Sequence, residues 1–198
     1  MKPYLIEAVG SGVYTYLVIS AISSGTDFNI PLLEALLFGL IVYLAYSKKN
    51  LVFINPAIAL AAWAVNLIGL KETGKIIVAQ SVGSLVALLL GVALLGSNPQ
   101  IIINFGSSVF VAELIGMTIF GFGMAAILFN KVTADLVGHV AAVSLFTGMM
   151  IAHFSGSSAI FNPFVAYAIG SLTPEYFLAA IFGAIAGVTA YKHLLSEK

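Results

Sequence analysis

Six stretches of this chain are apolar over nearly the length of a membrane span, and no other feature constrains its fold as strongly. A spanning helix needs about 20 mostly apolar residues. The six stretches cover residues 4–22, 31–46, 76–96, 108–129, 137–153 and 175–194. Because 61% of the 198 residues are hydrophobic and only 8% are charged, the apolar surface is larger than one small core can bury. The sequence therefore predicts an integral membrane protein with six spanning helices.

Two further apolar stretches, residues 51–70 and 159–170, are each interrupted by an Asn-Pro pair, at Asn55 and at Asn162. Proline breaks a helix when it falls inside one, but it is favoured at the first helical position. Asparagine is among the best N-cap residues. Each pair therefore predicts a short helix that begins inside the membrane, so we expect two re-entrant half-helices beside the six spans in an all-α membrane fold.

The lysines indicate the orientation, because cytoplasmic loops of membrane proteins hold the excess of Lys and Arg. If both termini are cytoplasmic and both interrupted stretches return to the side where they start, every lysine is cytoplasmic. These are Lys2, Lys48, Lys49, Lys71, Lys75, Lys131, Lys192 and Lys198. The outer side then carries Asp27, Glu34 and Glu175 and no lysine. The first apolar stretch begins at Tyr4 without an A-x-A-type cleavage site, so we expect a span rather than a removable signal.

The chain contains an internal repeat. When it is aligned with itself, Glu7 in the first span corresponds to Glu113 in the fourth, and the two Asn-Pro pairs correspond as well. Each half then reads as a span with Glu, a span, a half-helix and a span. Since three spans per half is an odd number, the halves, residues 1–100 and 101–198, must lie inverted in the membrane. We expect them to form one channel domain over residues 1–198.

Inverted halves would bring the N-termini of the two half-helices together at the membrane midplane. Each N-terminus carries about half a positive charge, which repels cations. The asparagines can cap their own helices through the carbonyl oxygen and direct NH2 donors into a lumen, while residues 48–54 and 154–161 offer carbonyl acceptors. This arrangement suits single-file passage of a polar, neutral molecule. The alternative is that each pair marks only a turn, as Asn98-Pro99 does in a polar loop.

These features resemble the aquaporin and aquaglyceroporin family of major intrinsic proteins, and the resemblance covers the whole chain. Glu7 and Glu113 match buried glutamates of its first and fourth spans, and residues 38–40 and 79–83 match motifs of its second and third. The resemblance implies one pore in each subunit of a homotetramer. Its two Asn-Pro boxes are Asn55, Pro56 and Ala57, and a degenerate second box of Asn162, Pro163 and Phe164.

The outer selectivity filter departs from the family pattern. The family usually has arginine after its second box, whereas this chain has Val165 there and no arginine anywhere. If both re-entrant loops are shortened by three residues, Phe38 and His153 take filter positions together, and Ala159 completes the predicted set. Met150 stays open as the alternative to His153, which could also be a histidine at the end of a helix, level with the lipid headgroups.

The two glutamates need partners, because a carboxylate inside a membrane is costly unless it is paired. Re-entrant loops have backbone N–H groups without helical partners, so we expect Glu7 and Glu113 to hold these loops in place. A proton relay is the other usual role of buried acids, but each glutamate is the only acid on its span.

The sequence thus predicts a passive channel for water, with small neutral solutes such as glycerol as further candidates. The protein is expected to be embedded in lipid, and the resemblance implies a homotetramer. Two alternatives remain open. Phe164 and the apolar residues 51–54 suit a structural or junctional protein with an occluded pore, and the missing arginine suits a less selective pore for ammonia or ions. Without arginine or cysteine we expect no nucleic-acid partner, thiolate metal site or disulfide. We expect neither an enzyme nor a cofactor, since no catalytic motif occurs.

Overall fold

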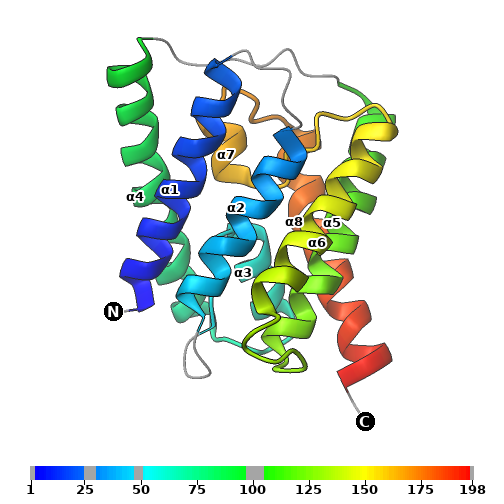
Figure 1. The fold of residues 1–198 in the computed structure, drawn as a ribbon. Coiled ribbons are helices and arrows are strands. Elements are labelled where there is room, and N and C mark those ends of the chain that lie inside the picture. Colours follow the sequence, from blue (N-terminus) through cyan, green and yellow to red (C-terminus); the bar gives the residue numbers. More distant parts are fainter. Residues whose placement is uncertain (1–2, 25–29, 47–50, 97–104, 197–198) are drawn as a thin grey trace.

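The computed structural model describes residues 3–24, 30–46, 51–96 and 105–196, and regular structure in these ranges is helical throughout (Figure 1). The helices are α1 (Pro3–Ser23), α2 (Ile30–Ala45), α3 (Pro56–Ala64), α4 (Leu70–Leu95), α5 (Ser107–Leu128), α6 (Val137–Phe154), α7 (Pro163–Ala168), α8 (Pro174–Tyr191) and the short π-helix η1 (Lys192–Ser196). Several residues used in the sequence analysis lie outside the described ranges, namely Lys2, Asp27, Lys48, Lys49, Asn98, Pro99 and Lys198.

The two halves of the chain have the same order of elements and opposite directions. Helices α1, α2 and α4 with the short α3 are followed by α5, α6 and α8 with the short α7. Figure 1 shows α1 rising from the end where the last helix finishes, whereas α5 descends toward that end. Half-helix α3 lies in the lower half of this view and α7 in the upper half. The predicted fold class, six long helices and two half-helices in an inverted repeat, is therefore confirmed.

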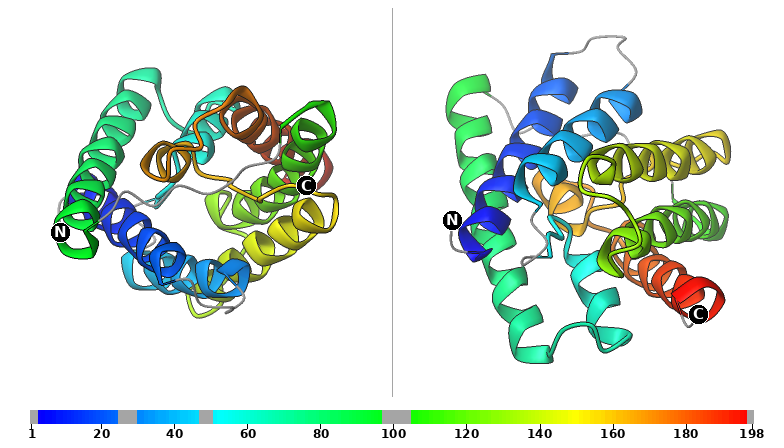
Figure 2. Two further views of the ribbon diagram at one scale, coloured as in Figure 1. Left: turned by 90° about the horizontal axis from the view of Figure 1, so that it is seen from above. Right: turned by 60° about the horizontal axis from the view of Figure 1, so that its bottom comes forward.

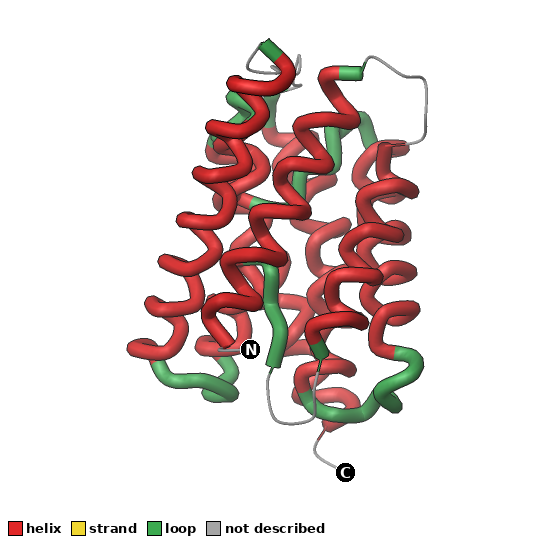
Figure 3. The backbone as a smooth tube through the Cα atoms, turned by 60° about the vertical axis from the view of Figure 1, so that its left-hand side comes forward, coloured by secondary structure: helices red, strands yellow, loops and turns green. Residues whose placement is uncertain are grey.

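The long helices enclose the half-helices. Seen from the end opposite the chain termini, they form a ring with α7 inside it (Figure 2). Helix α3 packs against α8 and α4, helix α7 packs against the same two helices, and α3 also contacts α7. Figure 3 shows the non-helical residues 51–55 rising between the helices to reach α3. The re-entrant segments thus meet in the interior of the ring.

Five of the described helices, α1, α4, α5, α6 and α8, are long and apolar enough to cross a membrane. Helix α2 is also apolar but has 16 residues, so it is shorter than a typical span. Helix α4 begins at Leu70 rather than at residue 76, where the sequence analysis placed it. Residues 71–75 fell between two apolar stretches, but charged side chains such as Lys and Glu are good helix formers and are compatible with a helix that extends beyond the apolar layer.

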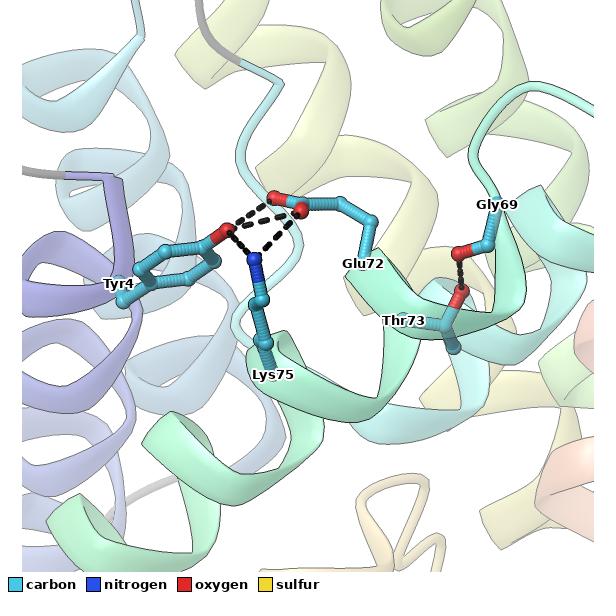
Figure 4. A network of polar contacts seen from close by, with 5 residues as sticks. All are labelled: Tyr4, Gly69, Glu72, Thr73 and Lys75. Atoms are coloured by element: carbon cyan, nitrogen blue, oxygen red, sulfur yellow. Dashed lines mark hydrogen bonds and ion pairs between the residues drawn. The ribbon is translucent and has the colours of Figure 1, made fainter.

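The early turns of α4 carry a polar network that joins it to α1 (Figure 4). The Tyr4 hydroxyl lies 2.8 Å from both carboxylate oxygens of Glu72 and donates to them. Lys75 Nζ donates to the Tyr4 hydroxyl at 3.3 Å and lies 3.9 Å from Glu72. The Glu72 and Lys75 side chains are 42% and 49% exposed, so this network contributes at most about 1 kcal/mol to stability.

Lys192, the C-cap residue of α8, supports half-helix α3 from its C-terminal end. Lys192 Nζ donates to the carbonyl oxygen of Val65 at 3.1 Å, and Val65 is the C-cap residue of α3. A cation at a helix C-terminus interacts favourably with the helix dipole. Through this bond the second half of the chain helps to fix a half-helix of the first.

Helices α1 and α4 approach so closely that glycine is required between them. A Cβ atom on Gly83 would lie 1.9 Å from the carbonyl oxygen of Ala8, and one on Gly12 would lie 2.9 Å from the carbonyl oxygen of Gly83. Backbone atoms cannot move aside as a flexible side chain can. Small residues at such crossings are typical of packed membrane helices.

We expect Gly83→Ala to force α1 and α4 apart and to lower the thermal stability of the purified protein. The clash involves backbone, so the loss should reach or exceed the roughly 1–3 kcal/mol of ordinary overpacking. Gly74→Ala is the matched control, because Gly74 lies in the same helix with open space around its Cβ position and alanine is the better helix former. Thermal unfolding in detergent measures both variants. Equal stability of the two would contradict the role of this crossing.

Candidate functional site

The two Asn-Pro pairs each begin a half-helix. Asn55 is the N-cap of α3, with extended backbone at φ −147° and ψ 123°, and its Oδ1 accepts from the N–H of Ala57 at 2.9 Å. Asn162 is the N-cap of α7, with φ −116° and ψ 114°, and its Oδ1 accepts from the N–H of Phe164 at 3.0 Å. A proline follows each cap at the start of its helix. The local geometry is therefore the same in both halves.

The side-chain amides of these two asparagines connect the re-entrant segments to each other. Asn55 Nδ2 donates to the carbonyl oxygen of Phe161 at 3.1 Å, and Asn162 Nδ2 donates to the carbonyl oxygen of Ile54 at 3.2 Å. Asn55 is 2% exposed and Asn162 is 4% exposed. Each amide nitrogen carries two N–H groups, so each asparagine keeps one donor without an acceptor among the described residues. The sequence analysis did not foresee these reciprocal bonds.

Glu7 of α1 lies against the first re-entrant segment. Its carboxylate accepts from the backbone N–H groups of Phe53 and Ile54, both at 2.8 Å, and from Gln80 Nε2 at 2.7 Å. Glu7 is 2% exposed. Gln80 had no role in the sequence analysis beyond its place in a motif of the third span. It comes from α4, so this carboxylate joins two long helices to the segment that precedes α3.

Glu113 of α5 lies against the second re-entrant segment with fewer bonds. Its Oε1 accepts from the hydroxyl of Ser157 and, at 3.2 Å, from the N–H of Ile160. Its Oε2 is buried without a hydrogen-bond partner among the described residues. The two glutamates that the repeat aligns therefore contact corresponding segments. Glu7 accepts hydrogen bonds with both carboxylate oxygens, whereas Glu113 does so with one.

The residue before Asn55 has a strained backbone. Ile54 has φ 53°, in the left-handed region, although it is β-branched and fully buried. A β-branched residue rarely adopts this conformation, and such strain persists only where the surroundings impose it. Here Glu7 binds the N–H of Ile54 and Asn162 donates to its carbonyl oxygen. Ala159, before the second box, also has a positive φ, of 56°.

A cavity of about 630 Å³ lies beside the second box, and we call it the vestibule. Its lining contains Asn162, Val165 and both candidates for the fifth-span filter position, His153 and Met150. Val165 is 3% exposed. The described residues of the lining are Tyr14, Ile22, Ile30, Pro31, Glu34, Met149, Met150, His153, Phe154, Ser157, Ser158, Ile160, Phe161, Asn162, Val165 and Ile169. Among the predicted residues of the filter and the second box, Phe38, Ala159, Pro163 and Phe164 do not belong to this lining.

Phe38 lies between two other rings rather than on the wall of the vestibule. It packs edge-on against Tyr14, with ring centroids 5.6 Å apart, and against Phe120, with centroids 5.3 Å apart. All three side chains are at most 4% exposed. The Tyr14 hydroxyl donates to Glu34 Oε2 at 2.9 Å. Sequence reasoning did not identify Tyr14, Phe120 or Glu34 as neighbours of the site.

The fold is that of a known class of membrane channels, although the sequence is distant from it. No protein-family model and no curated protein matches the sequence. The structure is similar to the X-ray structure of the aquaglyceroporin from Plasmodium falciparum, with a TM-score of 0.66 and 18% sequence identity, over 98% of this chain and 95% of that chain. At this identity the likeness establishes the fold. The protein is an integral membrane protein with an aquaporin-like fold.

Proposed function

We propose that this protein is a passive channel for water, with small neutral solutes such as glycerol as further candidates. The observation that carries the proposal is the meeting of two inverted half-helices through reciprocal bonds between Asn55, Asn162 and the carbonyl oxygens of the opposite segments. Each asparagine keeps one N–H donor for a permeating molecule. The partial positive charges of both helix N-termini oppose the passage of cations.

The proposal also includes the orientation of the protein in the membrane and its oligomeric state. Both termini are cytoplasmic, since positive charge accumulates on the cytoplasmic side. The described lysines lie in the first turns of α4 (Lys71 and Lys75), after α5 (Lys131) and after α8 (Lys192), and these helix ends are on the side where α1 begins (Figure 1). The vestibule beside Asn162 and Val165 then opens outward. Four subunits, each with its own pore, form the homotetramer that the family resemblance implies.

An occluded pore is a second candidate, favoured by the buried rings of Tyr14, Phe38 and Phe120. Osmotic shrinkage of proteoliposomes distinguishes the two. A water channel makes the vesicles shrink faster in sucrose than protein-free vesicles do. In glycerol, re-swelling after shrinkage indicates glycerol permeation. Shrinkage at the rate of protein-free vesicles would reject the channel and favour the occluded pore.

We expect Val165→Arg to reduce glycerol permeation more than water permeation. The guanidinium would extend into the vestibule that Val165 lines, narrowing it and adding fixed donors and a charge. A barrier higher by about 1.4 kcal/mol corresponds to a tenfold slower glycerol flux. Val165→Leu is the control for added volume without charge. An unchanged glycerol-to-water ratio in folded Val165→Arg would show that selectivity arises elsewhere.

A further inference from the structure

We propose that the vestibule binds a small primary ammonium cation, with the Glu34 carboxylate as its counter-ion. This inference concerns binding within the vestibule and does not require that the pore conduct. Among the residues that the structure describes, Glu34 is the only acidic side chain in the lining, and none of the described lysines belongs to it.

The Glu34 carboxylate is held in place by a hydrogen bond to one of its two oxygens. Its Oε2 accepts from the Tyr14 hydroxyl at 2.9 Å, and its Oε1 has no hydrogen-bond partner among the described residues. His153 is the one basic side chain in the lining, and it makes no ion pair with Glu34 within 4.0 Å in the part of the chain described. The carboxylate therefore faces the vestibule without a protein cation.

A carboxylate on a partly apolar wall attracts a cation more strongly than one in water. Removal from water weakens its solvation, and Coulomb attraction grows as the local dielectric constant falls. Glu34 lies near the start of α2, whereas the described lysines lie at the start of α4 and after α5 and α8; the start of α2 and these helix ends are on opposite sides of the molecule (Figure 1), and the chain has no arginine. No described lysine is therefore close enough to act as the counter-ion of this side chain.

The surroundings favour an ammonium cation over a divalent metal ion. No group of three or more His, Cys, Asp or Glu side chains that could hold a metal occurs among the described residues, whereas Mg²⁺ and Ca²⁺ take six or more oxygen ligands. An ammonium group needs hydrogen-bond acceptors, and Glu34 Oε1 and the lone pairs of the Tyr14 hydroxyl supply them. Met149 and Met150 line the same space and suit a short alkyl group.

The site shares its space with the path of a solute. Asn162 and Val165 line the vestibule together with Glu34, so a cation bound at Glu34 occupies volume that a molecule must cross to reach the second box. This further consequence rests on the proposed function: in a water-conducting pore, a bound ammonium cation is expected to slow the passage of water through the vestibule.

Equilibrium dialysis of radiolabelled methylammonium against the full-length protein in nanodiscs tests the site. We expect saturable binding to the wild type and an affinity at least tenfold weaker for Glu34→Gln. Glu72→Gln is the matched control, because that carboxylate lies near the start of α4 with Tyr4 and Lys75 as partners, and its binding should equal that of the wild type. Glu34→Gln must elute as folded protein, and Tyr14→Phe, which keeps the carboxylate, should bind with intermediate affinity.

Two results would overturn the inference. One is equal methylammonium affinity of the wild type and Glu34→Gln. The other is displacement of methylammonium by sodium chloride as effectively as by ammonium chloride, because the site would then recognise charge alone. Failure of the proposed function has a different signature, since proteoliposomes would shrink no faster than empty vesicles whatever the dialysis shows.

Discussion

Proteoliposomes that carry Asn162→Leu are expected to show no more water permeability than protein-free vesicles. Leucine removes the bond to the Phe164 N–H, the bond to the Ile54 carbonyl oxygen and the remaining N–H donor. Loss of the cap costs about 0.5–2 kcal/mol. The Ile54 carbonyl oxygen would keep only a long 3.5 Å bond from Ser11 Oγ. Asn55→Leu is expected to have the same effect, because its bonds are equivalent.

A serine variant separates the role of the donors from the role of the cap. Asn162→Ser keeps a capping oxygen but has no amide to reach Ile54 or a permeating molecule. We expect this variant to fold and to conduct water far more slowly than the wild type. Stopped-flow light scattering gives the rates, and elution volume and thermal unfolding give the state of the protein. Normal water flux through both leucine variants would refute a role of the asparagines in permeation.

Glu7→Leu should have the largest effect on stability of any substitution considered for this chain. It leaves the N–H groups of Phe53 and Ile54 and the amide of Gln80 without their acceptor in a buried position. Each hydrogen bond to a charged group is worth about 1.5–3 kcal/mol, and whole proteins are stable by only about 5–15 kcal/mol. We therefore expect little or no folded protein.

Leucine substitutions of two other glutamates in the chain serve as comparisons for Glu7→Leu. Glu113→Leu should be less damaging, since only one oxygen of Glu113 has partners among the described residues. Glu72→Leu removes an exposed carboxylate and should change stability by about 1 kcal/mol or less. The yield of monodisperse protein and its unfolding temperature rank the three. A Glu7→Leu protein as stable as Glu72→Leu would contradict the structural role of Glu7.

The six spans and two half-helices could be predicted because their signals are local. Length and apolarity determine a span, and an Asn-Pro pair within an apolar stretch provides both an N-cap and a favourable first residue. The predicted start of the third span, at residue 76, was wrong because it was set by where the apolar stretch begins, whereas α4 begins at Leu70. At a membrane surface such residues can continue a helix, and hydropathy alone does not distinguish the two.

The neighbours of the site could not be predicted, because they depend on how each helix is rotated about its axis. Helices that are apolar on all sides have no polar face that reveals this rotation. Glu34 was therefore assigned only to the outer side, and its bond to Tyr14 was missed. The repeat did contain a signal, since the alignment that pairs Glu7 with Glu113 also pairs Tyr14 with Phe120, the two rings that enclose Phe38.

The reciprocal asparagine bonds impose an order on biosynthesis. As the chain emerges from the ribosome, Glu7 and Gln80 can bind the segment before α3 as soon as the first half is inserted, because all three belong to that half. The amide of Asn55, however, finds its acceptor only after Phe161 has been synthesised. Until then a polar group inside the bilayer lacks this partner, which is costly in hydrocarbon. A chain whose synthesis stops between the two halves therefore cannot complete its fold. Cellular quality control would act on a chain in which the Asn55 amide still lacks this acceptor.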